Sequence, residues 1–158
     1  RPGRVAGRTR PAGRLVGAAY RGSRKGMTGG AILIGGDAGN EIGHTMRRGL
    51  IAIGGSAGDM LGFNMIAGTA RVFGECGIRP GAGVRRGTLG LRGRNPPALL
   101  STFRFASRSR SRTFQILVRH LQRQGFNVDE SLWSADLDLY HGDLVALGKG
   151  EVFLRRAA

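Results

Sequence analysis

Glycine recurs at a fixed interval of 19 residues through the middle of this chain, and no other feature limits the possible folds as strongly. Four separate columns of glycines keep this interval. The columns are Gly30, Gly49, Gly68 and Gly87; Gly36, Gly55, Gly74 and Gly93; Gly39, Gly58 and Gly77; and Gly43, Gly62 and Gly81. Self-similarity at one fixed period indicates a repeat architecture in which each period is one structural unit.

Each repeat opens with a short apolar run that glycines bracket, and these runs occupy residues 31–34, 50–53 and 69–72. Runs of this length favour strands over independent helices. A unit this small cannot bury its own apolar side chains, but units stacked in register bury them against their neighbours at a spacing of about 4.8 Å. The period therefore predicts an all-β fold, a single-stranded β-helix with one glycine-rich coil per repeat.

The glycines are expected at the corners of the coils, where the backbone needs a positive φ or where two coils approach too closely for a Cβ atom. For Gly36, Gly55 and Gly74 the sequence predicts tight corners with positive φ. Valine at any of these positions should therefore prevent folding or assembly, because a β-branched residue fits such a corner poorly.

The regular period ends at Pro96-Pro97, so we expect a β-helix over residues 1–94 and a C-terminal cap over residues 95–158. Residues 113–124 of the cap predict an amphipathic helix, with apolar residues at i, i+3, i+4 and i+7 from Phe114 and a stop at Gly125. This helix is expected to cover the last coil or to anchor another subunit. Residues 129–158 hold six acids and three cations, so the cap is expected to be helical and acidic.

The segment PAGRLVG at 11–17 repeats the spacing of DAGNEIG at 37–43, but a loop insertion, AAYRGSRKGMT, follows it. Insertions in repeat proteins collect on one face, which is often a binding face. Arg21, Arg24 and Lys25 in this insertion are therefore candidates for contact with a partner, and a plain solvated loop is the alternative. The sequence begins with Arg and not Met, so further N-terminal repeats are expected.

The chain is strongly basic, with 25 Lys and Arg residues against 10 Asp and Glu residues and a net charge of +15. Such a charge favours a polyanionic partner, although an ordinary solvated surface explains it equally well. Arg47-Arg48 and Arg85-Arg86 are two periods apart and should lie on one face, interrupted by Ile66-Ala67 in the coil between them. The alternating Ser and Arg residues at 107–112 are interpreted as a solvated lead-in to the helix, so nucleic-acid binding is not expected.

The sequence offers no convincing catalytic or metal-binding constellation. His44, His120 and His141 are scattered and have no partner at metal-ligand spacing. Cys76, the single cysteine, occupies the column of Ala38 and Ala57 and is interpreted as a small inert residue.

The acids of the repeats and the ends of the chain add further exclusions. Asp37, Asp59 and Glu75 are interpreted as solvated corner acids, and the glycine spacing is wrong for a calcium-binding loop. A phosphate-binding loop is not expected either, because Gly148-Lys149 is followed by Gly150 and not by Ser or Thr. No apolar run approaches the roughly 20 residues of a membrane span, and the start RPGRVAGRTR has no secretory signal. We therefore expect a cytoplasmic protein without membrane contact.

The units GGDAGNEIGHTMRRGLIAIGGSAGDMLG and MIAGTARVFGECGIRPGAGVRRGTL resemble the glycine-repeat third subunit of formylmethanofuran dehydrogenase and its bacterial relative in the formyltransferase/hydrolase complex. The glycine columns alone are also similar to the C-terminal β-helix of glutamate synthase large subunits. The stretches GAAYRGSRKGM and GDLVALGKGE favour the formylmethanofuran family, and the helix FQILVRHLQRQGF looks most like the bacterial, methylotroph version.

The resemblance implies a non-catalytic structural subunit in a complex that moves a formyl group from formyl-tetrahydromethanopterin to a methanofuran-type coenzyme and releases formate. The implied partners are formyltransferase, amidohydrolase-like and molybdopterin-enzyme-like subunits, with the metal in a partner and no cofactor bound by this chain. One alternative is the same third subunit in a tungsten or molybdenum formylmethanofuran dehydrogenase, an oxidoreductase. Another, from a different class, is a basic β-helix that acts alone and binds nucleic acid or another polyanion.

The family's coenzymes carry glutamate chains, which gives Arg47, Arg48, Arg85 and Arg86 a possible ligand. Guanidinium groups bind carboxylates in bidentate fashion, so this stripe, extended by Arg21, Arg24 and Lys25, is a candidate site for the coenzyme tail. A subunit interface with acidic partners is the alternative for the same residues.

Overall fold

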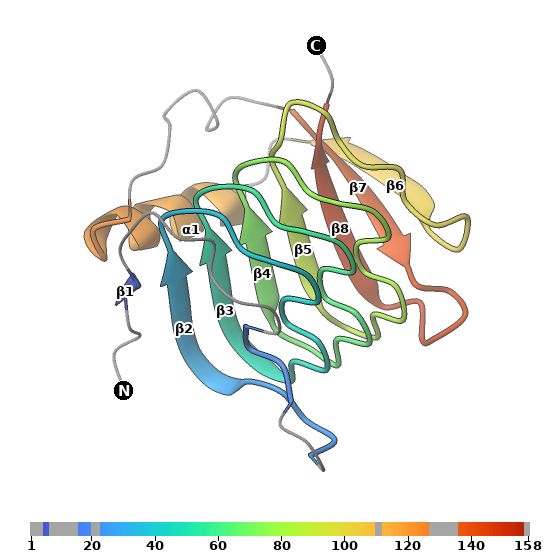
Figure 1. Ribbon diagram of the computed structural model, residues 1–158. Helices are drawn as coiled ribbons and strands as arrows, with labels where there is room; N and C mark the ends of the chain where they lie inside the picture. The colour runs from blue at the N-terminus through green and yellow to red at the C-terminus, as the bar shows by residue number, and fades with distance from the viewer. Residues whose placement is uncertain (1–4, 7–15, 20–22, 110–111, 127–135, 157–158) are drawn as a thin grey trace.

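The computed structural model describes residues 5–6, 16–19, 23–109, 112–126 and 136–156. These residues form eight strands in one sheet and one helix (Figure 1). The elements are β1 (Val5–Ala6), β2 (Thr28–Ile34), β3 (Arg48–Ile53), β4 (Thr69–Val72), β5 (Thr88–Leu91), β6 (Arg104–Ser109), α1 (Arg112–Arg123), β7 (Leu137–Gly142) and β8 (Gly150–Arg155). The strand order along the sheet is β1-β2-β3-β4-β5-β8-β7-β6.

Strands β2 to β5 pair in parallel, and their register follows the sequence period. Leu50 is aligned with Thr69, and Thr69 with Thr88, so each step across the sheet advances the chain by one 19-residue repeat. Each repeat contributes a single strand to this sheet, and the rest of the repeat turns back to the start of the next strand (Figure 1). The single-stranded β-helix that the glycine columns predict is therefore confirmed.

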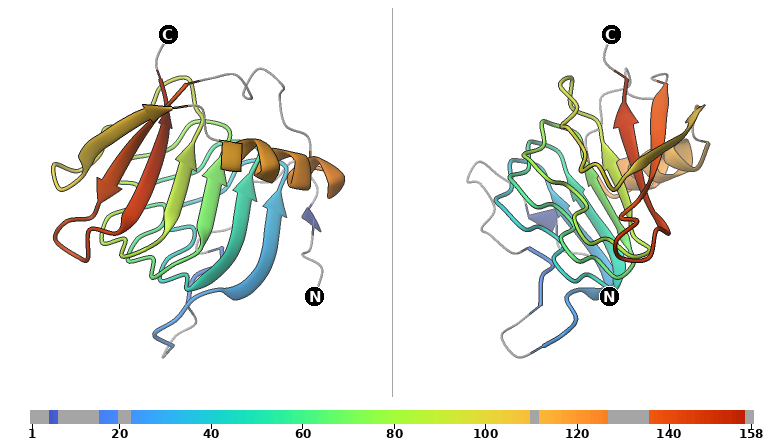
Figure 2. Two further views of the ribbon diagram at one scale, coloured as in Figure 1. Left: turned by 180° about the vertical axis from the view of Figure 1, so that it is seen from behind. Right: turned by 90° about the vertical axis from the view of Figure 1, so that its right-hand side faces the viewer.

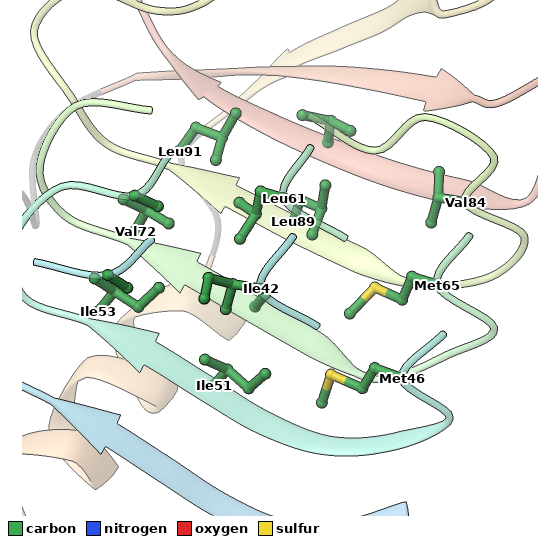
Figure 3. Packing of buried hydrophobic residues seen from close by; sticks show 14 of the residues in the cluster. Ile42, Met46, Ile51, Ile53, Leu61, Met65, Val72, Val84, Leu89 and Leu91 are labelled. Atoms are coloured by element: carbon green, nitrogen blue, oxygen red, sulfur yellow. The ribbon is translucent and has the colours of Figure 1, made fainter. Parts of the chain in front are cut away.

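The core lies inside the coils and consists of columns of similar side chains. Ile53, Val72 and Leu91 stack from strand to strand across the sheet, while Met46 and Met65 stack on the side where the chain returns (Figure 3). All of these side chains are at most 1% exposed. Each coil therefore buries its apolar residues mainly against the coils before and after it, as a repeat architecture requires.

The helix α1 lies on the outer face of the sheet, across the strands of the first coils (Figure 2). Its Val118 and Leu121 side chains pack against Leu33 of β2 and Ala52 of β3. The sequence predicts a helix that covers the last coil or anchors another subunit. In the structure the helix covers this outer face and not the last coil, and the anchoring of another subunit stays a prediction. The apolar residues that point outward from β2 and β3 explain the difference, since they need a cover as much as the end of the stack does.

The end of the coil stack is covered by strands. β8 returns to pair in parallel with β5, and then pairs antiparallel with β7, which pairs antiparallel with β6. Ser107–Ser109, the first part of the predicted solvated lead-in at 107–112, belong to β6, and Ser107 and Arg108 are exposed. The guanidinium Nε of Arg108 donates to the carboxylate of Asp138 on β7 at 2.7 Å, and this ion pair accompanies the strand pairing.

The glycine columns keep their spacing for two different physical reasons. Gly43, Gly62 and Gly81 have φ values of 72°, 66° and 74°, the left-handed conformation that glycine adopts at little cost. Gly55 and Gly74 do not have positive φ, so the expectation of strained corners in that column is wrong. A Cβ on Gly74 would lie 2.5 Å from the carbonyl carbon of Gly55, so close approach between coils requires glycine there.

Candidate interaction site at the arginine stripe

Backbone hydrogen bonds between coils place the predicted arginine stripe on one face. The Arg85 N–H donates to the carbonyl oxygen of Met65 at 2.9 Å, and the Arg47 N–H donates to that of Met27 at the same distance. Ile66 occupies the same position in the intervening coil. All four arginines of the stripe, Arg47, Arg48, Arg85 and Arg86, are exposed. Their two pairs lie two coils apart, which corresponds to about 10 Å at strand spacing.

The residues that precede the loop insertion stack on the coil that carries Arg47. Gly43 N–H donates to Val16 oxygen at 2.8 Å, as Gly62 N–H donates to Ile42 oxygen in the next coil, so the coil pattern continues upstream of the insertion. Arg24 and Lys25 are exposed, and Lys25 lines a cavity of about 540 Å³ together with Met27 and Thr28. Arg21, the third candidate in the insertion, lies outside the described residues.

At the other end of the stripe, Arg85 borders a groove between the last coil and the turn that joins β7 to β8. The groove has a volume of about 610 Å³ and is lined by Asn64, Gly83, Arg85, Asp143, Val145, Ala146 and Leu147. Val145 is 80% exposed and Leu147 is 44% exposed. The groove therefore places an exposed arginine beside exposed apolar side chains, and this combination suits a partner surface that has both acidic and apolar residues.

Asp143 fixes this turn against the coil stack. Its buried carboxylate accepts hydrogen bonds from the Gly83 N–H at 3.1 Å and the Val145 N–H at 3.0 Å. Burial works against ionisation of this carboxyl, but the Thr102 side chain and the hydrogen bonds from the Gly83 and Val145 N–H groups together hold its pKa below the usual value. The sequence does not single out this residue, because one Asp in GDLVALGKGE carries no repeat signal.

The acids of the repeats have a structural role that the prediction of solvated corner acids did not include. The Asp37 carboxylate accepts from the Ser56 N–H at 2.7 Å, and the Ser56 hydroxyl oxygen accepts from the Glu75 N–H at 3.0 Å. In a second column, Asn40 accepts from the Asp59 N–H, and Asp59 accepts from the Ile78 N–H, each at 2.9 Å. These side chains connect successive coils, which gives each acid a partner in the next repeat.

Cys76 lies partly buried within the coil stack, in a bridge with Ala57. Burial, followed by the negative charges of Asp59 and Glu75, raises the pKa of its thiol to about 12. His44 packs against the ring of Phe63, with 5.0 Å between ring centroids. Among the described residues, no group of three His, Cys, Asp or Glu side chains is placed to hold a metal ion. The same residues contain no helix long and apolar enough to span a membrane.

Comparison with known proteins gives a similarity to a solved structure. No family model and no curated protein matches the chain. A chain in the X-ray crystal structure of the formyltransferase/hydrolase complex (FhcABCD) from Methylorubrum extorquens, in complex with methylofuran, is 38% identical, with a TM-score of 0.79. The match covers 91% of this chain and 52% of that chain, so the present sequence spans about half the length of its relative.

Proposed function

We propose that this chain, similar over 91% of its length to one chain of the FhcABCD complex, is a non-catalytic assembly subunit of a formyltransferase/hydrolase complex. The proposed complex moves a formyl group from formyl-tetrahydromethanopterin to a methanofuran-type coenzyme and releases formate. The 38% identity, over an alignment that covers 91% of this chain, is the observation that carries the proposal.

The character of the described residues supports the non-catalytic part of the proposal. The repeat acids connect coils, the single thiol has a raised pKa, and the buried Asp143 holds a turn in place. The acids therefore have structural tasks, and the thiol is almost entirely un-ionised at neutral pH. None of these groups forms an acid/base pair at a cavity. The subunit purified alone should show no formyltransferase, hydrolase or dehydrogenase activity, and turnover by the isolated subunit would contradict this part of the proposal.

We further propose that the arginine stripe attracts the anionic, glutamate-bearing tail of the coenzyme. Arg47, Arg48, Arg85 and Arg86 are exposed and aligned, and guanidinium groups favour carboxylates. The relative's structure contains methylofuran, which makes a coenzyme of this kind the natural ligand to test.

Reversal of the four arginines to glutamate tests this second proposal within the assembled complex. If the tail binds at the stripe, the complex should assemble normally and show a raised, salt-sensitive KM for long-tailed coenzyme, with little change for a truncated one. Failure to assemble would identify the stripe as a subunit interface, and unchanged kinetics would show that it does not attract the tail. Either result would remove the coenzyme-tail proposal.

A further inference from the structure

Two arginine side chains are buried on the outer face of the sheet, where α1 begins. Arg71 in β4 is 5% exposed, and Arg92, which follows β5, is 2% exposed. The register aligns Arg71 with Leu33 and Ala52, the apolar residues that α1 covers in the earlier coils. The outer face therefore changes from apolar to cationic toward the cap.

The surrounding residues hold both guanidinium groups in place. The Arg92 Cζ atom lies 3.5 Å from the centre of the Phe114 ring in the first turn of α1, and the Arg71 Cζ atom lies 5.4 Å from it. Arg71 also extends across Gly90, where a Cβ atom would collide with its guanidinium group. The Phe114 ring makes a cation–π contact with the face of a guanidinium group, but it accepts no hydrogen bond from the N–H groups that lie in the guanidinium plane.

Several of those N–H groups have no partner among the described residues. The Nε atom of Arg71 and the Nε and Nη1 atoms of Arg92 are buried there without a hydrogen bond. Buried polar groups in folded proteins are nearly always hydrogen-bonded, so unpaired nitrogens on two neighbouring cations call for a further acceptor.

The charges around the pair point to an anion as that acceptor. Burial lowers the pKa of Arg71 to about 10, and the carboxylate of Glu151 opposes this change. Burial, then the positive charges of Arg71 and Arg155, lower the pKa of Arg92 to about 9. The first turn of α1 contains no acid, and the positive end of a helix dipole adds to the same potential.

We propose that Arg71, Arg92 and the N-terminal end of α1 form a binding site for a single carboxylate group. The cations Arg71, Arg92 and Arg155 outnumber the single carboxylate of Glu151, and a carboxylate ligand brings a negative charge with about four acceptor positions for the unpaired N–H groups. The carboxylate comes either from a small free ligand or from an acidic side chain of a partner subunit, and both sources supply the same chemistry.

Thermal unfolding of the full-length subunit in sodium formate or sodium acetate, against sodium chloride at equal ionic strength, tests for the free ligand. A bound carboxylate should raise the Tm in a saturable way, by about 5 °C at a hundredfold excess over its dissociation constant. Arg92→Met should abolish this response and should be no less stable than the parent in chloride, because it removes an uncompensated buried charge. Arg119→Met, at an exposed arginine of α1 outside both proposed sites, is the matched control and should keep the response.

Gly90→Ala provides a second variant that leaves both arginines in the chain. Its Cβ would displace the Arg71 guanidinium, so the carboxylate response should weaken as it does in Arg71→Met. A response of equal size in all of these variants would overturn the proposal, because it would show a general salt effect and not a site.

The assembled complex tests the second source. If the isolated subunit does not respond to free carboxylates, but Arg71→Met and Arg92→Met lower the Tm of the complex without lowering that of the subunit, a partner supplies the carboxylate. If neither the subunit nor the complex shows these effects, the arginines form no carboxylate site.

Discussion

Gly74 has no side chain, and its absence permits two successive coils to approach each other closely. A Cβ at this position would lie 2.5 Å from the carbonyl carbon and 2.6 Å from the carbonyl oxygen of Gly55, whereas a Cβ on Gly35 would meet nothing within 4 Å. Neither residue has a positive φ, so the two positions differ only in coil-to-coil contact.

Gly74→Ala should therefore lower the free energy of unfolding by about 1–3 kcal/mol, the usual cost of overpacking a rigid interior. Gly35→Ala is the control and should change it by less than about 0.5 kcal/mol. Urea unfolding of both variants measures the difference. Equal losses would mean that the coils do not approach as closely as the backbone contacts indicate.

Cys76 allows a second prediction at the residue scale. Because the pKa of its thiol is raised to about 12, almost none of the thiol is ionised at neutral pH, and the thiolate is the form that reacts. Maleimide or iodoacetamide at about pH 7.5 should modify the native protein far more slowly than the urea-unfolded protein. Comparable rates in both states would show an exposed, reactive thiol.

At the scale of the repeated element, side-chain hydrogen bonds connect each coil to the next. Asp59 accepts from the Ile78 N–H, and Asn40 performs the same task one coil earlier with its amide oxygen. Asp59→Asn should therefore leave stability nearly unchanged, while Asp59→Ala should reduce the free energy of unfolding by about 0.5–1.5 kcal/mol. If both variants lose the same amount, the charge of Asp59 matters and its hydrogen bond does not.

The turn between β7 and β8 depends on Asp143, whose pKa is lowered in the folded state. A carboxyl of this kind stabilises the fold above its unfolded pKa of about 3.9, and the stabilisation is lost as the pH falls through the lower folded pKa. Asp143→Ala should therefore lower the free energy of unfolding at about pH 7, and the difference in this free energy between variant and parent should decrease below about pH 4. Unfolding curves between about pH 7 and pH 3 measure this difference. A difference that does not change with pH would show that the ionised form of Asp143 is not the stabilising one.

At the scale of the whole molecule, the sequence was sufficient to predict the coil stack and the register that the period sets. The 19-residue step sets the register of β3 to β5 and the alignment of Arg47 with Arg85. The return of β8 to β5 could not be predicted, because Thr88 and Glu151 pair across a segment that has no repeat.

The position of α1 and the burial of two arginines could not be predicted either, although the sequence contained part of the signal. On the outer face, Leu33 and Ala52 point away from the coils, and Phe73 follows β4. A row of apolar residues on an outer face predicts that another element of the chain or a partner covers it. Arg71 continues the row of Leu33 and Ala52, but a charged residue at an outward position is normally solvated, so its burial becomes evident only when α1 is in place.

The most direct test of the central proposal is the mass of the native particle that contains this chain. The chain should be tagged in its own cells, purified without added salt and measured by native mass spectrometry with identification of every component. We predict a hetero-oligomer that includes formyltransferase and hydrolase subunits, as the 38% identity to a chain of the FhcABCD complex leads us to expect. A free monomer, or a particle of this chain with nucleic acid, would contradict the proposal and would favour a basic β-helix that acts alone.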